Sequence, residues 1–291
     1  MRLVRDLLAS LARLSSRPSA VLSLASLLVL LALVATVGVD AAIAPQLGAA
    51  PRAVWTPAGV DRPFLEDLPW YHPSWRRQTG AAWGALGLLA ILVFTFGDAV
   101  LLRAAVGPWK GLREAWGEAA RRGWALLVVT VTSLAWVALV ALAAHRLIGE
   151  KIADYVAHVP GEIHAMAAAL LPDLLWLSLA APVIVAADQA RALLVIENRR
   201  SGLLALWRGL RGVLSSPRPM AASLLTLALE SVALGALVLL RDVWDPRLAA
   251  GPAIASAAIL AAALIRILAR GCYLGALGRA STRAPAADRR S

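Results

Sequence analysis

Residues 125–144 read ALLVVTVTSLAWVALVALAA and contain no charged side chain. A helix of about 20 mainly apolar residues is long enough to cross the hydrocarbon core of a bilayer. Because the apolar residues cover every face of such a helix, the pattern is typical of a membrane span and not of an amphipathic surface helix. This stretch therefore predicts an all-α integral membrane protein.

Five more runs of the same kind lie on either side of it. They are Ala20–Val39, Ala81–Leu102, Met166–Ala187, Met220–Leu240 and Ala253–Leu274. The composition of 60% apolar and 16% charged residues excludes an ordinary soluble domain, which is about 45–50% apolar and about 25% charged. We therefore expect one bundle of six transmembrane helices over residues 1–280, followed by a disordered basic tail over 281–291.

The net charge of +11 is carried almost wholly by arginine, because only Lys110 and Lys151 are lysines. The arginines gather before the first run, after the second and fourth runs, and in the tail. By the positive-inside rule, this distribution predicts a multi-pass protein of the inner membrane with both termini in the cytoplasm. The arginine clusters are then expected to face anionic lipid headgroups, not nucleic acid. The preference for arginine over lysine indicates a GC-rich bacterial genome.

The predicted cytoplasmic segments resemble one another. Each contains an amphipathic stretch that leads into a span: Asp6–Leu14, Trp109–Trp116 and Leu203–Arg211. Such stretches are typical of helices that lie in the membrane interface. They predict three helix-hairpin units, 1–104, 105–196 and 197–280, although any six-span protein with regular loops would give a similar pattern.

Ionisable residues inside spans are the first candidates for a functional site. Glu230 lies in the fifth run, and Arg266 and Arg270 lie four residues apart on one face of the sixth. Because these runs form a hairpin, we expect Glu230 and Arg266 to make a buried pair within a cluster of these three residues. The pair could fix the bundle, or it could act in a proton or substrate relay.

Two aspartates, Asp98 and Asp188, lie near the cytoplasmic ends of the second and fourth runs, and Arg270 occupies about the same place in the sixth. We expect the aspartates to form water-exposed pairs with Arg103 and Arg191, which follow them within one or two turns. Intramembrane aspartyl proteases also use two aspartates, but the residues around Asp98 and Asp188 do not match their motifs.

No pattern of nucleophile, phosphate-binding loop or metal ligands is present, and Cys272 is the only cysteine. We therefore predict no catalytic residue, no metal and no cofactor. The first outer loop, Asp40–Gly80, is rich in aromatic residues, among them Trp55, Trp70, Tyr71 and Trp75. These residues could form an aromatic belt at the membrane surface, or they could bind a partner.

The residues Ala192–Glu197, Gly202, Ala205–Trp207 and Leu210 carry a family resemblance. They resemble bacterial six-span membrane proteins of uncharacterised function that are similar to the membrane domain of some glycerophosphodiester phosphodiesterases. In that family a serine and a tryptophan usually follow the alanine-leucine pair, whereas Trp207 and Arg208 follow it here. The resemblance implies the six-span fold and an amphipathic helix before the fifth span.

These observations favour a non-enzymatic accessory or scaffold protein that associates with other membrane proteins. The alternative is a small transporter or permease-like protein for a lipid or small solute, which would use the charges of the fifth and sixth spans. A membrane enzyme acting on lipid would have only Asp98 and Asp188 as candidates.

Overall fold

The computed structural model describes residues 2–47, 55–56, 59–60, 73–156, 170–197, 199–242 and 251–282. These residues are almost entirely helical. The exception is a short antiparallel pair of strands, β1 (Trp55–Thr56) and β2 (Gly59–Val60). The chain divides into two compact units, one of residues 23–94 and one of residues 1–22 with 95–291.

The smaller unit holds most of α2 (Pro18–Leu47), the strand pair and the first part of α4 (Pro73–Val106). The predicted aromatic site of the outer loop falls here. Trp70 and Tyr71 lie outside the described residues, and the side chains of Trp55 and Trp75 are not described either. The two interpretations of that loop, a belt or a partner site, therefore stay predictions.

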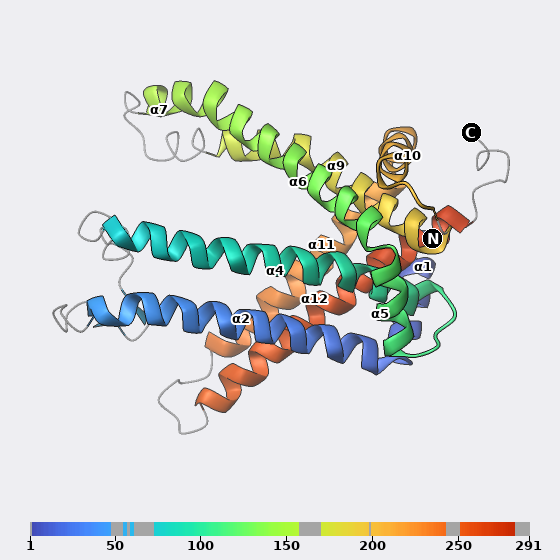
Figure 1. The fold of residues 1–291 in the computed structure, drawn as a ribbon, viewed down its shortest axis with the longest axis horizontal. Coiled ribbons are helices and arrows are strands. Elements are labelled where there is room, and N and C mark those ends of the chain that lie inside the picture. The colour runs from blue at the N-terminus through green and yellow to red at the C-terminus, as the bar shows by residue number, and fades with distance from the viewer. Residues whose placement is uncertain are drawn as a thin grey trace. The chain divides into compact units, whose positions relative to one another are not determined.

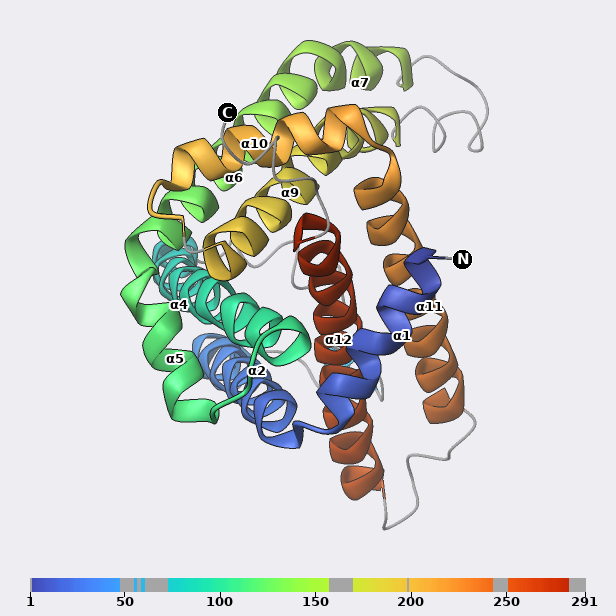
Figure 2. The same cartoon turned by 90° about the vertical axis from the view of Figure 1, so that its right-hand side faces the viewer.

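The larger unit holds the remaining helices and the end of α4. They are α1 (Arg2–Ser15), α5 (Leu112–Arg121), α6 (Gly123–Ala144), the π-helix η2 (His145–Gly149), α7 (Glu150–Val156), α9 (Leu171–Ile196), α10 (Gly202–Ser215), α11 (Arg218–Asp242) and α12 (Gly251–Thr282). Figure 1 shows α6 beside α9, and α11 beside α12. Figure 2 shows α10 lying along α9 and α6, and α1 lying against α12. The α6–α9 pair and the α11–α12 pair meet where α9 contacts α12.

Five of the described helices are long and apolar enough to cross a membrane, and the number is six if α1 and the start of α2 count as one bent span. The chain is thus a multi-pass helical membrane protein. Four predicted runs, Ala81–Leu102, Met166–Ala187, Met220–Leu240 and Ala253–Leu274, fall largely within α4, α9, α11 and α12. The run 125–144 lies within α6.

The buried core of the larger unit lies at one end of its spans. This is the end at which α4, α9 and α12 finish and α6 begins. Its largest fully buried apolar side chains are Leu14, Leu101, Leu102, Leu126, Leu194, Leu274, Val100 and Val129. Much of α6 and α11 exposes apolar side chains, among them Leu134 and Leu139 of α6 and Leu224 and Val232 of α11. A surface in contact with lipid tails permits this, because lipid tails are as apolar as leucine.

Small residues allow the closest helix contacts. A Cβ atom on Gly209 of α10 would collide with the carbonyl oxygen of Ala186 in α9. Gly271 and Gly275 of α12 are covered by Leu14 and Ser10 of α1. Helices with small residues at an interface can bring their backbones together in this way. The two α12 glycines, four residues apart on one helix face, therefore allow α1 to pack closely against α12.

Two arginines, one at the end of α1 and one between α1 and α2, donate hydrogen bonds to the C-terminal end of α4. A helix leaves its last four carbonyl oxygens without partners inside the helix. Arg17 donates to the carbonyl oxygens of Ala104 and Gly107, and Arg13 donates to that of Val106 at 2.8 Å. The Arg17 guanidinium also lies 5.9 Å from the centre of the Trp109 ring. Burial and the nearby Arg13 lower the pKa of Arg17 from its usual value.

We expect Arg17→Ala to destabilise the protein, because it leaves helix-end carbonyls without a donor. A hydrogen bond to a charged group contributes about 1.5–3 kcal/mol to stability. Hydrogen exchange should rise at the amides around Gly107. Arg5→Ala is the control, because Arg5 is exposed and makes no hydrogen bond or ion pair within the described residues. Equal exchange in both variants would contradict the assigned role of Arg17.

Candidate functional site

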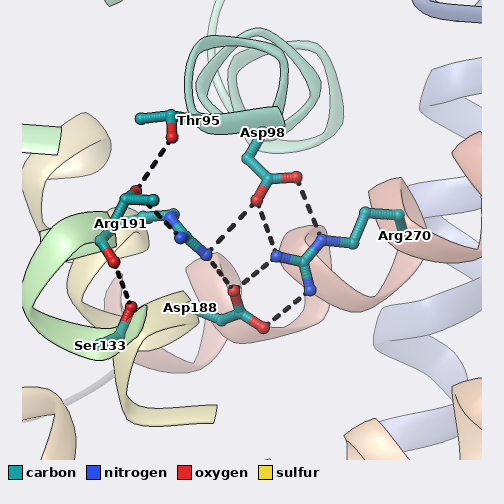
Figure 3. Close-up of polar contacts among 7 residues, drawn as sticks. Thr95, Asp98, Ser133, Asp188, Arg191 and Arg270 are labelled. Atoms are coloured by element: carbon teal, nitrogen blue, oxygen red, sulfur yellow. Dashed lines mark hydrogen bonds and ion pairs between the residues drawn. The ribbon is translucent and has the colours of Figure 1, made fainter. Parts of the chain in front are cut away.

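Three spans are joined by one arginine in the buried end of the larger unit. Arg270 of α12 lies between Asp98 of α4 and Asp188 of α9 (Figure 3). Its Nε and Nη2 atoms donate to the two carboxylate oxygens of Asp98 at 3.0 and 2.7 Å. Its Nη1 and Nη2 atoms donate to the carboxylate of Asp188 at 2.7 and 2.5 Å. Both contacts are bidentate, which is the strongest geometry of an arginine with a carboxylate.

Arg191 of α9 completes this charge network, which we define as Asp98, Asp188, Arg191 and Arg270. Its Nη1 atom lies 2.6 Å from Asp188 Oδ1 and 3.5 Å from Asp98 Oδ2. Its Nη2 atom donates to the hydroxyl of Thr130 in α6 at 3.1 Å. The network therefore reaches a fourth helix.

Hydroxyl groups hold the α6 side of the site in place. Thr95 of α4 donates to the Thr130 hydroxyl at 3.0 Å, and Ser133 donates to the Thr130 carbonyl oxygen at 2.9 Å. All three side chains are buried. A hydroxyl inside an apolar helix needs such a partner, because an unpaired buried polar group costs about 1–3 kcal/mol.

The charges of the network balance, with two carboxylates and two guanidinium groups. Asp98 is 5% exposed and Asp188 is 1% exposed. Taking a charge out of water costs several kcal/mol, which an ion pair repays only with good geometry and additional hydrogen bonds. The bidentate contacts supply that geometry. Because no charge is in excess, the arrangement favours a fixed link between helices over a group that binds or releases a proton.

Tyr273 lies one turn after Arg270 and beside the network. The Arg270 guanidinium lies 5.6 Å from the centre of its ring. The Tyr273 hydroxyl and the Arg191 Nε atom are buried and meet no hydrogen-bond partner in the described part of the chain. Two buried polar atoms of the site, one on Tyr273 and one on Arg191, are thus left without a hydrogen bond among the described residues.

The expected environment of Asp98 and Asp188 was wrong. Both were expected to be exposed to water at helix ends, and both are buried. The last residues of their helices, Val106 and Ile196, come eight positions later. Eight residues of helix amount to about 12 Å, so the aspartates lie well inside the spans.

The expected partners of the two aspartates also differ from the observed ones. Arg191 contacts Asp188, as the sequence spacing indicated. Arg103 does not contact Asp98. Instead, it pairs with Glu118 of α5 through Nε–Oε2 at 2.7 Å and Nη2–Oε1 at 3.0 Å.

The predicted cluster of Glu230, Arg266 and Arg270 is divided in the structure. Arg270 belongs to the charge network. Glu230 and Arg266 come together, with 3.6 Å between Arg266 Nε and Glu230 Oε1, but Arg266 is 67% exposed and Glu230 19%. The pair is therefore not buried in the bundle and lies at its surface. Arg270 follows Arg266 by about 6 Å of helix, which brings it to the level of the aspartates.

One signal in the sequence did point to the network. Asp98, Asp188 and Arg270 occupy similar places in the second, fourth and sixth runs, and helices that cross the membrane in the same direction bring such positions to one level. Thr95, Thr130 and Ser133 were not singled out, because hydroxyl residues in apolar helices usually bond to their own backbone.

Comparison of the chain with protein-family models, with curated proteins and with solved structures gives no match. Within the described ranges, no group of three His, Cys, Asp or Glu side chains could hold a metal ion. The functional proposal therefore rests on the geometry alone.

Proposed function

We propose that this chain is a non-enzymatic accessory or scaffold protein of the bacterial inner membrane, and that it associates with other membrane proteins through the outer face of α11 and α12. The observation that carries the proposal is the ion pair of Glu230 and Arg266. It joins α11 to α12 within two membrane-spanning segments, and its arginine is 67% exposed.

A charged side chain in contact with lipid tails is costly, and intramembrane charges usually face a protein interior or a water-filled cavity. Arg266 lies mid-span in α12, and α11 has the smallest buried share of the five spans, 11%. A helix of a partner membrane protein on this face would cover the ion pair and remove it from lipid. The rest of the α11 surface, which includes Leu224, Leu227 and Val232, would add apolar contact.

The charge network supports the same function. It ties α12 to α4 and α9 at one end, so that the α11–α12 hairpin is held on the bundle while its outer face is presented to a partner. A binding surface is most effective when it is held rigidly before binding, because less conformational freedom is then lost.

The orientation follows from the arginine-rich segments, which gather at the end that holds the charge network. By the positive-inside rule we place this end, and both termini, in the cytoplasm. We further propose that α1, α5 and α10 lie in the membrane interface, where anionic lipid headgroups would contact their arginines. Gly202, Ala205, Gly209 and Val213 of α10 are buried against the bundle, whereas Leu203, Trp207 and Leu214 are exposed, as an interfacial helix requires.

Site-specific photo-cross-linking in native membranes tests the proposal. A photoreactive residue at Val232 of α11 should give a discrete protein adduct, and one at Leu139 of α6, which is also apolar and exposed, should give none. Arg266→Met should reduce the Val232 adduct several-fold. Adducts of equal yield at both positions, or none at Val232, would overturn the proposal. An adduct with a second copy of the chain would identify the partner as the chain itself.

The second candidate is a small transporter or permease-like protein for a lipid or small solute. The exposure of Arg266 favours it, because a water-filled path along α11 and α12 would also stabilise the charges. Cysteines at Ser231 and Ala262, in a Cys272→Ser background, distinguish the two functions. Labelling by a membrane-impermeant thiol reagent would support the transporter. Positions that stay unlabelled would support the accessory protein.

A further inference from the structure

A basic pocket lies where α6 begins. It has a volume of about 490 Å³ and is lined by four arginines, namely Arg121, Arg122, Arg199 and Arg200. The first two end α5 and precede α6, and the other two precede α10. Two pairs of neighbouring arginines, far apart in the sequence, thus face one space.

The positive charge of this pocket is only partly neutralised by nearby carboxylates among the described residues. Glu118 also lines it, but Glu118 is bonded to Arg103 at 2.7 Å. Arg199 pairs with Glu197 at 3.3 Å. Arg121 and Arg200 pair with no carboxylate among the described residues.

Arg122 is held in place by the backbone. Its Nη1 atom donates to the carbonyl oxygen of Val195 at 2.9 Å, which ties the start of α6 to the end of α9. Burial lowers the pKa of Arg122, Glu118 raises it, and the nearby Arg103 and Arg121 lower it further.

Two helix N-termini add to the positive field. A Cβ atom on Gly202 would lie 2.5 Å from the Ala125 carbonyl oxygen, so the first turns of α10 and α6 are packed together. The N-terminus of a helix carries a partial positive charge and offers N–H groups to an anion. A second pocket of about 250 Å³, lined by Arg199, Arg200, Ser201 and Arg208 among others, adjoins the first because it shares Arg199 and Arg200.

The walls of the pocket also include apolar surface at the membrane level. Trp124 is 81% exposed and stands at the first turn of the α6 span, and Leu204 in the adjoining pocket is exposed too. Tryptophan at the end of a span is typical of the membrane–water interface. A small soluble anion has no apolar part that could contact this wall, whereas the glycerol and first acyl carbons of a lipid could pack on it.

We propose that this pocket binds the phosphorylated headgroup of an anionic phospholipid. The two arginine pairs favour a headgroup with two phosphates, each bound by one pair, since arginine binds phosphate oxygens in a bidentate manner. Basic pockets between membrane helices bind such headgroups in general. The site is separate from the α11–α12 face, so this proposal goes beyond the proposed association and does not depend on it.

Lipid binding to the purified, detergent-solubilised protein tests the proposal, with native mass spectrometry as the measurement. The probes are diphosphatidylglycerol, phosphatidylglycerol and phosphatidylcholine, with inorganic phosphate as a competitor. We expect affinity to fall in that order of lipids, and millimolar phosphate to leave the lipid bound. Equal affinity for the three lipids would overturn the proposal. Displacement of the lipid by inorganic phosphate would overturn the lipid source and assign the site to a soluble phosphate compound.

A charge-matched pair of variants separates the pocket from general attraction. Arg121→Gln with Arg200→Gln removes two pocket charges that make no ion pair within the described residues, and should weaken diphosphatidylglycerol binding about tenfold. Arg5→Gln with Arg211→Gln removes two exposed arginines outside the pocket and should change it less than about twofold. An equal loss in both variants would overturn the proposal. An unchanged Tm of each variant shows that folding is not affected.

Discussion

Arg270→Met is expected to lower the free energy of unfolding by about 3–5 kcal/mol, because it leaves Asp98 and Asp188 buried with only Arg191 between them. Methionine keeps an unbranched side chain in the same place, so the loss reports the missing charge. Thermal unfolding in lipid nanodiscs measures the effect as a fall in Tm.

Arg266→Met is the matched control for this prediction. Arg266 lies on the same helix and also pairs with a carboxylate, but it is largely exposed. The distance between its Nε atom and Glu230 Oε1 is 3.6 Å, longer than the distances that Arg270 makes. Loss of an exposed ion pair costs about 0–1 kcal/mol. If both variants lose the same stability, Arg270 has no special part in holding the spans together.

A double variant adds a further check. Asp98→Asn with Arg270→Met removes one charge of each sign and leaves Asp188 paired with Arg191 at 2.6 Å. We expect this variant to recover much of the stability that Arg270→Met loses, because its remaining charges are balanced again. No recovery would mean that the hydrogen bonds of Arg270 are needed and that charge balance alone is insufficient.

Gly209→Ala is expected to displace α10 from α9, because the new methyl group would overlap the Ala186 carbonyl oxygen. Overpacking costs about 1–3 kcal/mol when side chains can shift, and a backbone oxygen cannot shift alone. We therefore expect a loss at or above the upper end of that range. Tm and the accessibility of a cysteine placed at Ala186 would measure it.

Gly212→Ala, one turn later on α10, is the control. Its Cβ atom would meet the end of the Gln189 side chain, which is flexible and can move away. Alanine is also favoured over glycine inside a helix by about 0.5–1 kcal/mol. We expect this variant to be neutral or slightly stabilised, and a loss equal to that of Gly209→Ala would contradict the packing argument.

The membrane spans could be predicted because each depends on a local property, the length of an apolar run. The common level of Asp98, Asp188 and Arg270 could also be estimated, because these residues occupy similar places in the second, fourth and sixth runs. Which side chains meet at that level depends on which helices are neighbours. No local pattern reports that α12 lies against α9 while α11 stays at the surface, so Arg270 was grouped with Glu230.

The amphipathic helices show the same limit. The spacing of Leu7, Leu8, Leu11 and Leu14 predicts one apolar face on α1. Leu7 and Leu14 are buried, whereas Leu8 and Leu11 are exposed. The helix that covers this face is α12, at the other end of the sequence. For α10 the sequence indicated a face of large leucines, whereas the face that packs is the one of small residues, because only these permit close approach to α9.

The contact of α1 with α12 has a consequence for biosynthesis. Arg279 donates to the Asp6 carbonyl oxygen at 2.8 Å and to the Ser10 hydroxyl, across 273 residues of chain. At a translation rate of about 5–20 residues per second, α1 waits roughly 15–55 s for its docking site to emerge from the ribosome. During that time its apolar face must rest on lipid or on the insertion machinery. α1 is therefore synthesised long before the helix on which it docks, and its docking can only follow the synthesis of α12.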